Sequence, residues 1–172
     1  MKKTIEELNG FESYLQERII GQESPISKAI DAFENGALGF SEPGKPLASL
    51  LFLGPTGVGK TELTLNVGEF LFGKEKVFRF DMSEYMHEDA IKILLGNDVS
   101  DSGKLGKILE KHQGGILLFD EIEKANHRIF DLFLQILGSA RISLSNHKTY
   151  DLSQFFVVCT SNIGSDVLTD IR

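Results

Sequence analysis

One stretch of the sequence has the residue types and spacing of a phosphate-binding loop. Residues 54–61 read GPTGVGKT and match the pattern G-x-x-x-x-G-K-[ST]. Glycines allow the backbone to wrap so closely that successive N–H groups point at phosphate oxygens. Lys60 would reach the β- and γ-phosphates, and the Thr61 hydroxyl would bind Mg²⁺. We therefore predict a site for a magnesium-bound nucleotide.

The flanking residues favour this interpretation over a glycine-rich turn with an incidental lysine. The apolar run 50–53 is suited to a buried strand, and residues 62–72 are suited to a helix that Gly73 closes. A helix N-terminus adds partial positive charge at the phosphates. The residues expected to wrap the phosphates are Thr56, Gly57, Val58, Gly59, Lys60 and Thr61.

A second motif follows the apolar run 116–119, where Asp120 and Glu121 end a predicted strand. Asp120 would hold the Mg²⁺ coordination shell, directly or through a water molecule. Glu121 would polarise the water that attacks the γ-phosphate. Acidic pairs also cap helices that follow strands. Downstream of a phosphate-binding loop, we favour the catalytic interpretation, which is the Walker B pattern.

Asn162 ends the last predicted strand, after Thr160 and Ser161. In doubly wound sheets, functional groups gather at the carboxyl ends of the strands. An amide there can orient the attacking water or sense the γ-phosphate. Asn is also common as a turn residue after a strand. Spacing alone does not decide between these two interpretations.

The elements that must position these groups alternate between strands and helices, which predicts an α/β fold with a parallel sheet and right-handed crossovers. The expected strands are residues 50–53, 77–81, 116–120 and 155–160. The expected helices are residues 62–72, 87–95, 103–111 and 128–137, the last with Ile129, Phe133, Ile136 and Leu137 on one side. Residues 141–152 would hold a small hairpin.

Two helices are expected before the first strand. Thr4 and Glu7 form a capping-box pattern for a first helix that reaches about Arg18. Ser24 and Pro25 are suited to the N-cap and first position of a second. The apolar face of this second helix would comprise Ile26, Ala29, Ile30, Phe33 and Ala37. Residues 39–46 hold two prolines and two glycines and are expected to form a loop.

Composition limits the class of protein. The chain has 172 residues, a net charge of −7, 41% hydrophobic residues and one cysteine. The acidic balance without a long basic run makes nucleic-acid binding unlikely by charge. Cys159 cannot form an internal disulfide and is expected in the core. The four histidines lack metal-ligand spacing. We see no signal peptide and no membrane-spanning run, and expect a soluble, cytoplasmic protein.

Taken together, the motifs resemble those of the AAA+ ATPases, and more narrowly the second ATPase module of Clp-type unfoldases. The resemblance covers nearly the whole chain from about Leu15. The matching blocks are Ile19–Gln22, Gly54–Thr61, Phe80–Tyr85, Leu118–Ala125 and Thr160–Asn162. Several blocks in the same order are a specific signal.

The resemblance implies a P-loop NTPase three-layer sandwich, the AAA+ large subdomain, over residues 1–172. Residues 1–47 would be N-terminal helices and linker, and residues 48–172 the core. Ile19, Ile20 and Gly21 would border the adenine of ATP, and Asn162 would be the sensor residue. The family forms hexameric rings that use ATP to pull polypeptides through a central pore.

Two departures from the family affect the functional prediction. The substrate-gripping loop of the family carries an aromatic residue, whereas residues 96–103 here have none and form a loop about five residues shorter. The arginine finger, fifth strand and helical lid of the family follow the sensor Asn, whereas this sequence stops at Arg172. We therefore expect the lid to be absent, the strand before the phosphate loop to have an unpaired edge, and hydrolysis to be weak. Arg141 is either a ring-interface contact or a solvated loop residue.

Three functions are compatible with these features. The first is an ATP-hydrolysing module of a Clp-like machine that remodels a protein substrate. The second is a nucleotide-dependent scaffold whose altered loop docks a protein partner without threading it. The third is a loader acting on DNA, against which the acidic balance and the Clp-like blocks count.

Overall fold

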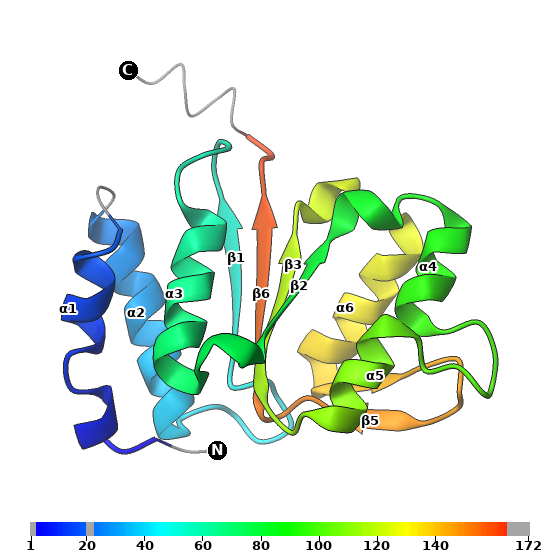
Figure 1. Ribbon diagram of the computed structural model, residues 1–172, viewed down its shortest axis with the longest axis horizontal. Helices are drawn as coiled ribbons and strands as arrows, with labels where there is room; N and C mark the ends of the chain where they lie inside the picture. Colours follow the sequence, from blue (N-terminus) through cyan, green and yellow to red (C-terminus); the bar gives the residue numbers. More distant parts are fainter. Residues whose placement is uncertain (1–2, 20–22, 165–172) are drawn as a thin grey trace.

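The central sheet has four parallel strands. The computed structural model describes residues 3–19 and 23–164. The strand order is β1-β6-β3-β2, and each neighbouring pair is parallel (Figure 1). The strands are β1 (Ala48–Leu53), β2 (Val77–Asp81), β3 (Gly115–Asp120) and β6 (Phe155–Ser161). The predicted parallel α/β sheet is therefore confirmed.

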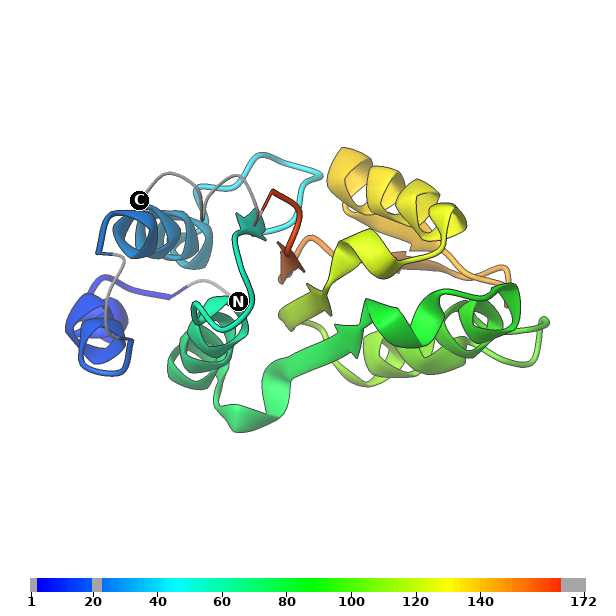
Figure 2. The ribbon, with the colours of Figure 1, turned by 90° about the horizontal axis from the view of Figure 1, so that it is seen from above.

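Helices cover both faces of this sheet, as Figure 2 shows. One layer contains α1 (Phe11–Gln16), α2 (Glu23–Leu38) and α3 (Lys60–Phe72), and the other contains α4 (Glu88–Leu95), α5 (Gly103–Lys111) and α6 (His127–Ser139). Side chains alternate between the two layers along β3, so Ile116 and Leu118 pack into one core while Leu117 and Phe119 pack into the other. The three-layer P-loop sandwich is confirmed.

The prediction that the strand before the phosphate loop is buried is wrong for β1. The side chains of Leu51 and Leu53 are 57% and 59% exposed, whereas β3 and β6 are buried throughout. The cause is position, because β1 pairs with β6 along one edge and no other described strand pairs with it. An apolar sequence alone does not distinguish a central strand from an edge strand.

The predicted first helix is interrupted. A 3₁₀ turn, η1 (Glu6–Leu8), is separated from α1 by Gly10, whose φ of 85° lies in the left-handed region. The capping box itself is confirmed, because the Thr4 N–H donates to Glu7 at 2.8 Å and the Glu7 N–H donates to the Thr4 hydroxyl at 3.3 Å. The break lets apolar side chains on both segments pack against α2 and α3.

Two other helical predictions need correction. Helix α2 begins at Glu23, so Ser24 is not its N-cap, although the five predicted apolar positions are all buried. In α6, Leu137 is exposed and Leu132 is buried in its place. Leu137 borders an apolar hollow beside the exposed face of the edge strand β1, which explains its exposure.

The remaining elements are short. They are η2 (Lys74–Lys76), η3 (Met82–Tyr85), η4 (Ile122–Lys124), β4 (Arg141–Ser143) and β5 (Thr149–Asp151). Strands β4 and β5 pair antiparallel, as the predicted hairpin requires. The hairpin is held on α5 by a chain of hydrogen bonds, in which Asn146 donates to the Tyr150 hydroxyl at 2.7 Å and Tyr150 donates to Glu110 at 2.8 Å.

Candidate functional site

The predicted phosphate-binding loop connects β1 to α3. It leaves the sheet at Gly54, and α3 begins at Lys60. Gly57 and Gly59 have φ angles of 82° and 92°, which L side chains rarely adopt. The predicted strand–loop–helix context is therefore present, with the N–H groups and the partial positive charge of a 13-residue helix at the end of the loop.

The predicted phosphate, metal and catalytic residues line one hollow of about 420 Å³ at the carboxyl end of the sheet. They come from the loop before α3, from the end of β3 and from the end of β6. The predicted residues at this hollow are Thr56, Gly57, Val58, Gly59, Lys60, Thr61, Asp120, Glu121 and Asn162. Arg79 and Thr160, which the sequence analysis did not single out, also line it.

Asp120 and Thr61 form a compact set of oxygen atoms. Both carboxylate oxygens of Asp120 lie 3.1 Å from the Thr61 hydroxyl, and the Thr160 hydroxyl also donates to the carboxylate. Mg²⁺ prefers hard oxygen ligands such as carboxylate and hydroxyl groups. The donor set therefore fits a magnesium ion that is bound jointly with a nucleotide phosphate.

Lys60 is held at the mouth of the loop. Its ammonium group donates to the carbonyl oxygens of Gly54 and Pro55, and to the side-chain oxygen of Asn162 at 2.9 Å. These acceptors are neutral, so the positive charge of Lys60 stays available to a phosphate. The hydrogen bond from Lys60 also holds the side-chain amide of Asn162 beside the phosphate loop.

Glu121 has an unusual backbone conformation, with φ 56° and ψ 52°. Non-glycine residues are uncommon in this left-handed region and are enriched at functional sites. Its carboxylate pairs with Lys124 at 2.5 Å and accepts a hydrogen bond from Asn162 at 3.3 Å. The ion pair with Glu121 raises the pKa of Lys124 above its ordinary value. The backbone N–H of Glu121 donates to Thr160 at 3.0 Å.

Asn162 connects the loop, the acidic motif and the turn η4. Its own N–H donates to Glu123 at 3.1 Å. Burial raises the pKa of Glu123, but hydrogen bonds from its own N–H, Asn162 and Ser161 outweigh this effect and hold the pKa below its ordinary value. These contacts place the Asn162 side chain between the phosphate loop and the acidic motif.

The predicted adenine-binding residues are only partly described. Ile19 lines a small apolar hollow that is separate from the 420 Å³ hollow. Val58 and Lys60 of the phosphate loop and Leu63 of α3 also line it. The Cγ2 atom of Ile19 lies about 4.0 Å from where a Cβ on Gly59 would be. Ile20 and Gly21 lie outside the described residues.

Comparison with known proteins is consistent with this geometry. The sequence profile of the AAA domain (Cdc48 subfamily) matches residues 45–172, which is most of the chain. The chain belongs to this AAA family. The chaperone ClpB 1 of Synechococcus elongatus is 38% identical over 99% of the chain, ClpB3, mitochondrial, of Oryza sativa subsp. japonica is 39% identical over 96%, and ClpB of Bacillus cereus is 40% identical over 96%.

This similarity makes the chain a Clp-type AAA+ ATPase module. The AAA module corresponds to 20%, 17% and 20% of the lengths of these three relatives, so the chain spans about a fifth of the curated relatives that it matches. Among the described residues of the module, no helix is both long enough and apolar enough to cross a membrane.

Sequence reasoning missed three side chains at the AAA site. Arg79 pairs with Asp120, Thr160 bridges Asp120 and the Glu121 backbone, and Lys124 pairs with Glu121. Arg79 had one available signal, because it is the only charged residue inside the otherwise apolar run 77–80. The contacts of Thr160 and Lys124 depend on how two strand ends meet, which the sequence does not specify.

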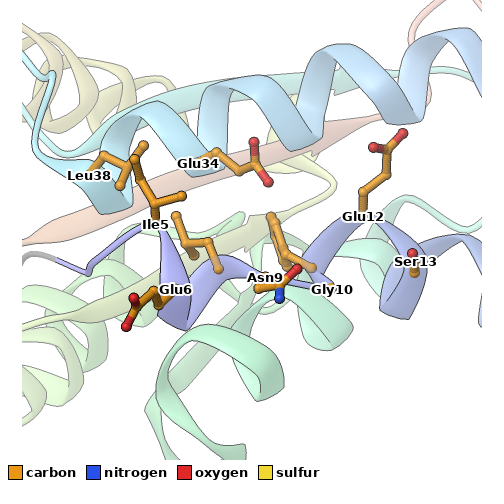
Figure 3. A pocket seen from close by; sticks show the side chains of 10 residues that line it. Ile5, Glu6, Asn9, Gly10, Glu12, Ser13, Glu34 and Leu38 are labelled. Atoms are coloured by element: carbon orange, nitrogen blue, oxygen red, sulfur yellow. The ribbon is translucent and has the colours of Figure 1, made fainter.

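Other features of the AAA module lie away from this hollow. Another hollow, of about 440 Å³, lies between α1, η1 and α2. Figure 3 shows the side chains that line it, among them Glu12 and Glu34. Burial, with Asp31 and Glu12 nearby, raises the pKa of Glu34. The negative charge of these acidic side chains disfavours the binding of a phosphate group in this hollow.

Cys159 is buried, which raises its pKa to about 12 and agrees with packing rather than reactivity.

The described residues contain no group of three or more histidine, cysteine or acidic side chains arranged to hold a metal ion by themselves. None of the four histidines is buried. In the AAA site, a magnesium ion would need nucleotide oxygens to complete the shell begun by Thr61 and Asp120.

Proposed function

We propose that the chain binds ATP with Mg²⁺ and hydrolyses it. The observation that carries the proposal is the convergence of Lys60, Thr61, Asp120, Glu121 and Asn162, from three separate segments, on one hollow. A nucleoside triphosphate needs this combination of loop N–H groups, a lysine, oxygen ligands for a metal and a carboxylate beside the terminal phosphate.

Each side chain has a role that follows from its position. The loop N–H groups and Lys60 bind the phosphates, and Thr61 and Asp120 hold the ion. Bound Mg²⁺ supplies charge neutralisation on the phosphate oxygens. Glu121 orients a water molecule and accepts its proton at a carboxylate oxygen, while Asn162 keeps the carboxylate in place through its amide nitrogen.

We extend the proposal to the larger protein. Because its relatives are ClpB chaperones, we propose that the chain works within a Clp-like machine that assembles as a hexameric ring and remodels a protein substrate. We further propose a cytoplasmic location, which the single cysteine supports. Nucleic acid is not among the proposed partners, given the net charge of −7.

A second function is favoured by the loop between α4 and α5. Asp98 accepts hydrogen bonds from the Ser100 N–H at 2.8 Å and from its hydroxyl at 2.6 Å, and Asp101 accepts from the Gly103 N–H at 3.1 Å. Val99 is 66% exposed but is the only large apolar side chain of the loop. Such a closed, polar loop is suited to docking a protein partner rather than gripping an extended chain.

The primary test is equilibrium binding of a fluorescent ATP analogue with Mg²⁺ to this chain. Lys60→Ala should abolish binding, whereas Lys92→Ala, which removes an exposed lysine on α4, should leave it unchanged. Glu121→Gln should bind normally, but turnover by the full-length protein should be lost. Loss of both binding and turnover in Glu121→Gln would contradict the role given to Glu121.

An unfolding assay with the full-length protein distinguishes threading of a substrate from docking of a partner. If the loop threads a substrate, Val99→Tyr should increase ATP-dependent unfolding of a tagged protein. If the loop docks a partner, ATP should change the oligomeric mass with no unfolding, and Val99→Tyr should not create any. An increase in unfolding would therefore reject docking.

A further inference from the structure

Arg79 lies on β2 and reaches the acidic residue of the neighbouring strand. Its Nη2 atom is 2.6 Å from Oδ2 of Asp120. The Asp120 side chain is 7% exposed, and the Arg79 side chain is 50% exposed. The ion pair thus joins a buried carboxylate to a guanidinium group that borders the nucleotide hollow and remains open to solvent.

A buried carboxylate is costly unless a positive charge is close to it. The other described partners of Asp120 are the hydroxyl groups of Thr61 and Thr160, which are neutral. Lys60 contacts carbonyl groups and Asn162, and Lys124 contacts Glu121. Among the described contacts, Arg79 is therefore the cation that pairs with Asp120.

We propose that Arg79 takes the place of Mg²⁺ at Asp120 when no nucleotide is bound, and releases the carboxylate when the magnesium nucleotide arrives. This inference rests on the proposed function. Arg79 is then a positioning residue that holds the Asp120 carboxylate directed toward Thr61. It also sets the Mg²⁺ concentration that the site requires.

The physical reason is competition for one carboxylate. A guanidinium group and a dication repel each other when both lie against the same two oxygens. The ion pair between Arg79 and Asp120 must open before the metal-bound state forms. The apparent Mg²⁺ affinity is therefore reduced in proportion to the fraction of molecules in which the pair is open. The exposed half of Arg79 allows the side chain to turn toward solvent without opening the core.

The test is thermal unfolding of this chain with a fixed excess of ADP while Mg²⁺ is titrated. Removing the charge in Arg79→Gln should lower the melting temperature of the nucleotide-free protein. It should also move the Mg²⁺ midpoint about threefold to tenfold lower, because no cation competes for Asp120. Arg79→Lys keeps the positive charge but lacks the planar guanidinium group that can bind both carboxylate oxygens. It should give an intermediate Mg²⁺ midpoint. Arg128→Gln, which breaks the exposed pair with Glu88, is the control and should leave the midpoint unchanged.

Three results would overturn the proposal. An unchanged or higher Mg²⁺ midpoint in both Arg79 variants would show that Arg79 does not compete with the ion. Loss of ADP binding without Mg²⁺ in Arg79→Gln would show that the guanidinium contacts the nucleotide instead. The third result is that ADP does not stabilise the unmodified chain. This result would mean that the proposed nucleotide site does not bind ADP, and it is distinguishable from the first two. If Arg79→Gln does not fold, the midpoint of Arg79→Lys alone decides the outcome.

Discussion

Asn162 and Lys60, which are 102 positions apart, are joined by a hydrogen bond of 2.9 Å from the lysine ammonium to the side-chain oxygen of the asparagine. The amide nitrogen of the same Asn162 donates to Glu121 at 3.3 Å. One side chain therefore connects the proposed phosphate-binding lysine to the proposed catalytic base. A change at Asn162 should affect the two groups differently.

We expect Asn162→Ala to reduce ATP turnover by about tenfold to a hundredfold, since Glu121 loses one of the two side chains that hold its carboxylate, the other being Lys124. Nucleotide affinity should change less than about threefold, because Lys60 keeps its charge and its carbonyl contacts. The measurement is steady-state hydrolysis by the full-length protein beside equilibrium binding to this chain. Equal losses in turnover and binding would contradict the orienting role.

The closed loop between α4 and α5 depends on glycine at its end. Gly103 has φ 65°, and a Cβ there would lie 2.3 Å from the nitrogen of Gly96 and 2.5 Å from the oxygen of Leu94. Gly103→Ala should lower the free energy of unfolding by about 3 kcal/mol or more, since backbone atoms cannot move aside easily. Chemical denaturation measures this loss.

The matched control is Gly138→Ala in the last turn of α6, where a Cβ would meet no atom within 4 Å. There the same substitution should stabilise the protein by up to about 1 kcal/mol, because alanine is the better helix former. If the two variants have the same stability, the close approach at Gly103 does not constrain the loop.

The hydrogen-bond chain from Asn146 through Tyr150 to Glu110 should stabilise the hairpin on α5. Tyr150→Phe leaves the buried amide of Asn146 without its hydroxyl acceptor, which should cost about 1–2 kcal/mol of unfolding free energy. It should also raise the pKa of Glu110 toward its ordinary value, since the Tyr150 hydrogen bond is the largest cause of its lowering. NMR titration of the glutamate carboxyl groups follows that change.

Thr149→Val is the control for the hairpin surface, because it removes only an exposed hydroxyl that pairs with Ser143. Its effect on stability should stay within about 0.5 kcal/mol. A Tyr150→Phe variant as stable as Thr149→Val, with an unchanged Glu110 pKa, would show that the chain of hydrogen bonds contributes nothing measurable.

The loop should loosen in acid. Hydrogen bonds from Ser100 lower the pKa of Asp98, and the Gly103 N–H with Lys107 lowers that of Asp101. Because both folded-state pKa values lie below those of the unfolded chain, their stabilisation is complete above about pH 4 and is lost as the pH falls through the lowered values. Amide hydrogen-exchange protection at Ser100 and Gly103 should fall in that window.

The N–H of Phe40, which donates to a backbone carbonyl at 2.9 Å, provides an internal reference for the same experiment. Its protection should not follow the titration of the two aspartates. Parallel loss at Phe40 and at the loop would indicate global acid unfolding instead of local release.

Much of the fold was predictable because its strands and helices have distinct patterns. Helix α5 and strand β2 have the predicted bounds, and β3 and β6 differ by one residue at one end. The errors about burial share a cause, which is that apolar character does not indicate where an element lies in the fold. Leu51 and Leu137 are as apolar as core residues, yet both are exposed beside the edge of the sheet.

The members of the candidate site were also predictable, since their spacing in the chain is characteristic. Lys60 and Thr61 follow a recognisable loop pattern, and Asp120 and Glu121 close an apolar strand. Their roles stay predictions until binding and turnover are measured. The ion pair of Arg79 was not predictable, because a lone arginine in a strand does not indicate which neighbouring strand it faces.

The sequence by itself determined the parallel α/β fold, its P-loop and the residue types of the site, because local patterns and the order of motifs are written along the chain. Tertiary structure alone decided how Asn162 reaches both Lys60 and Glu121, and which cations accompany the two carboxylates. These features arise where distant segments meet. They depend on the strand order and the packing of side chains between layers, neither of which local sequence specifies.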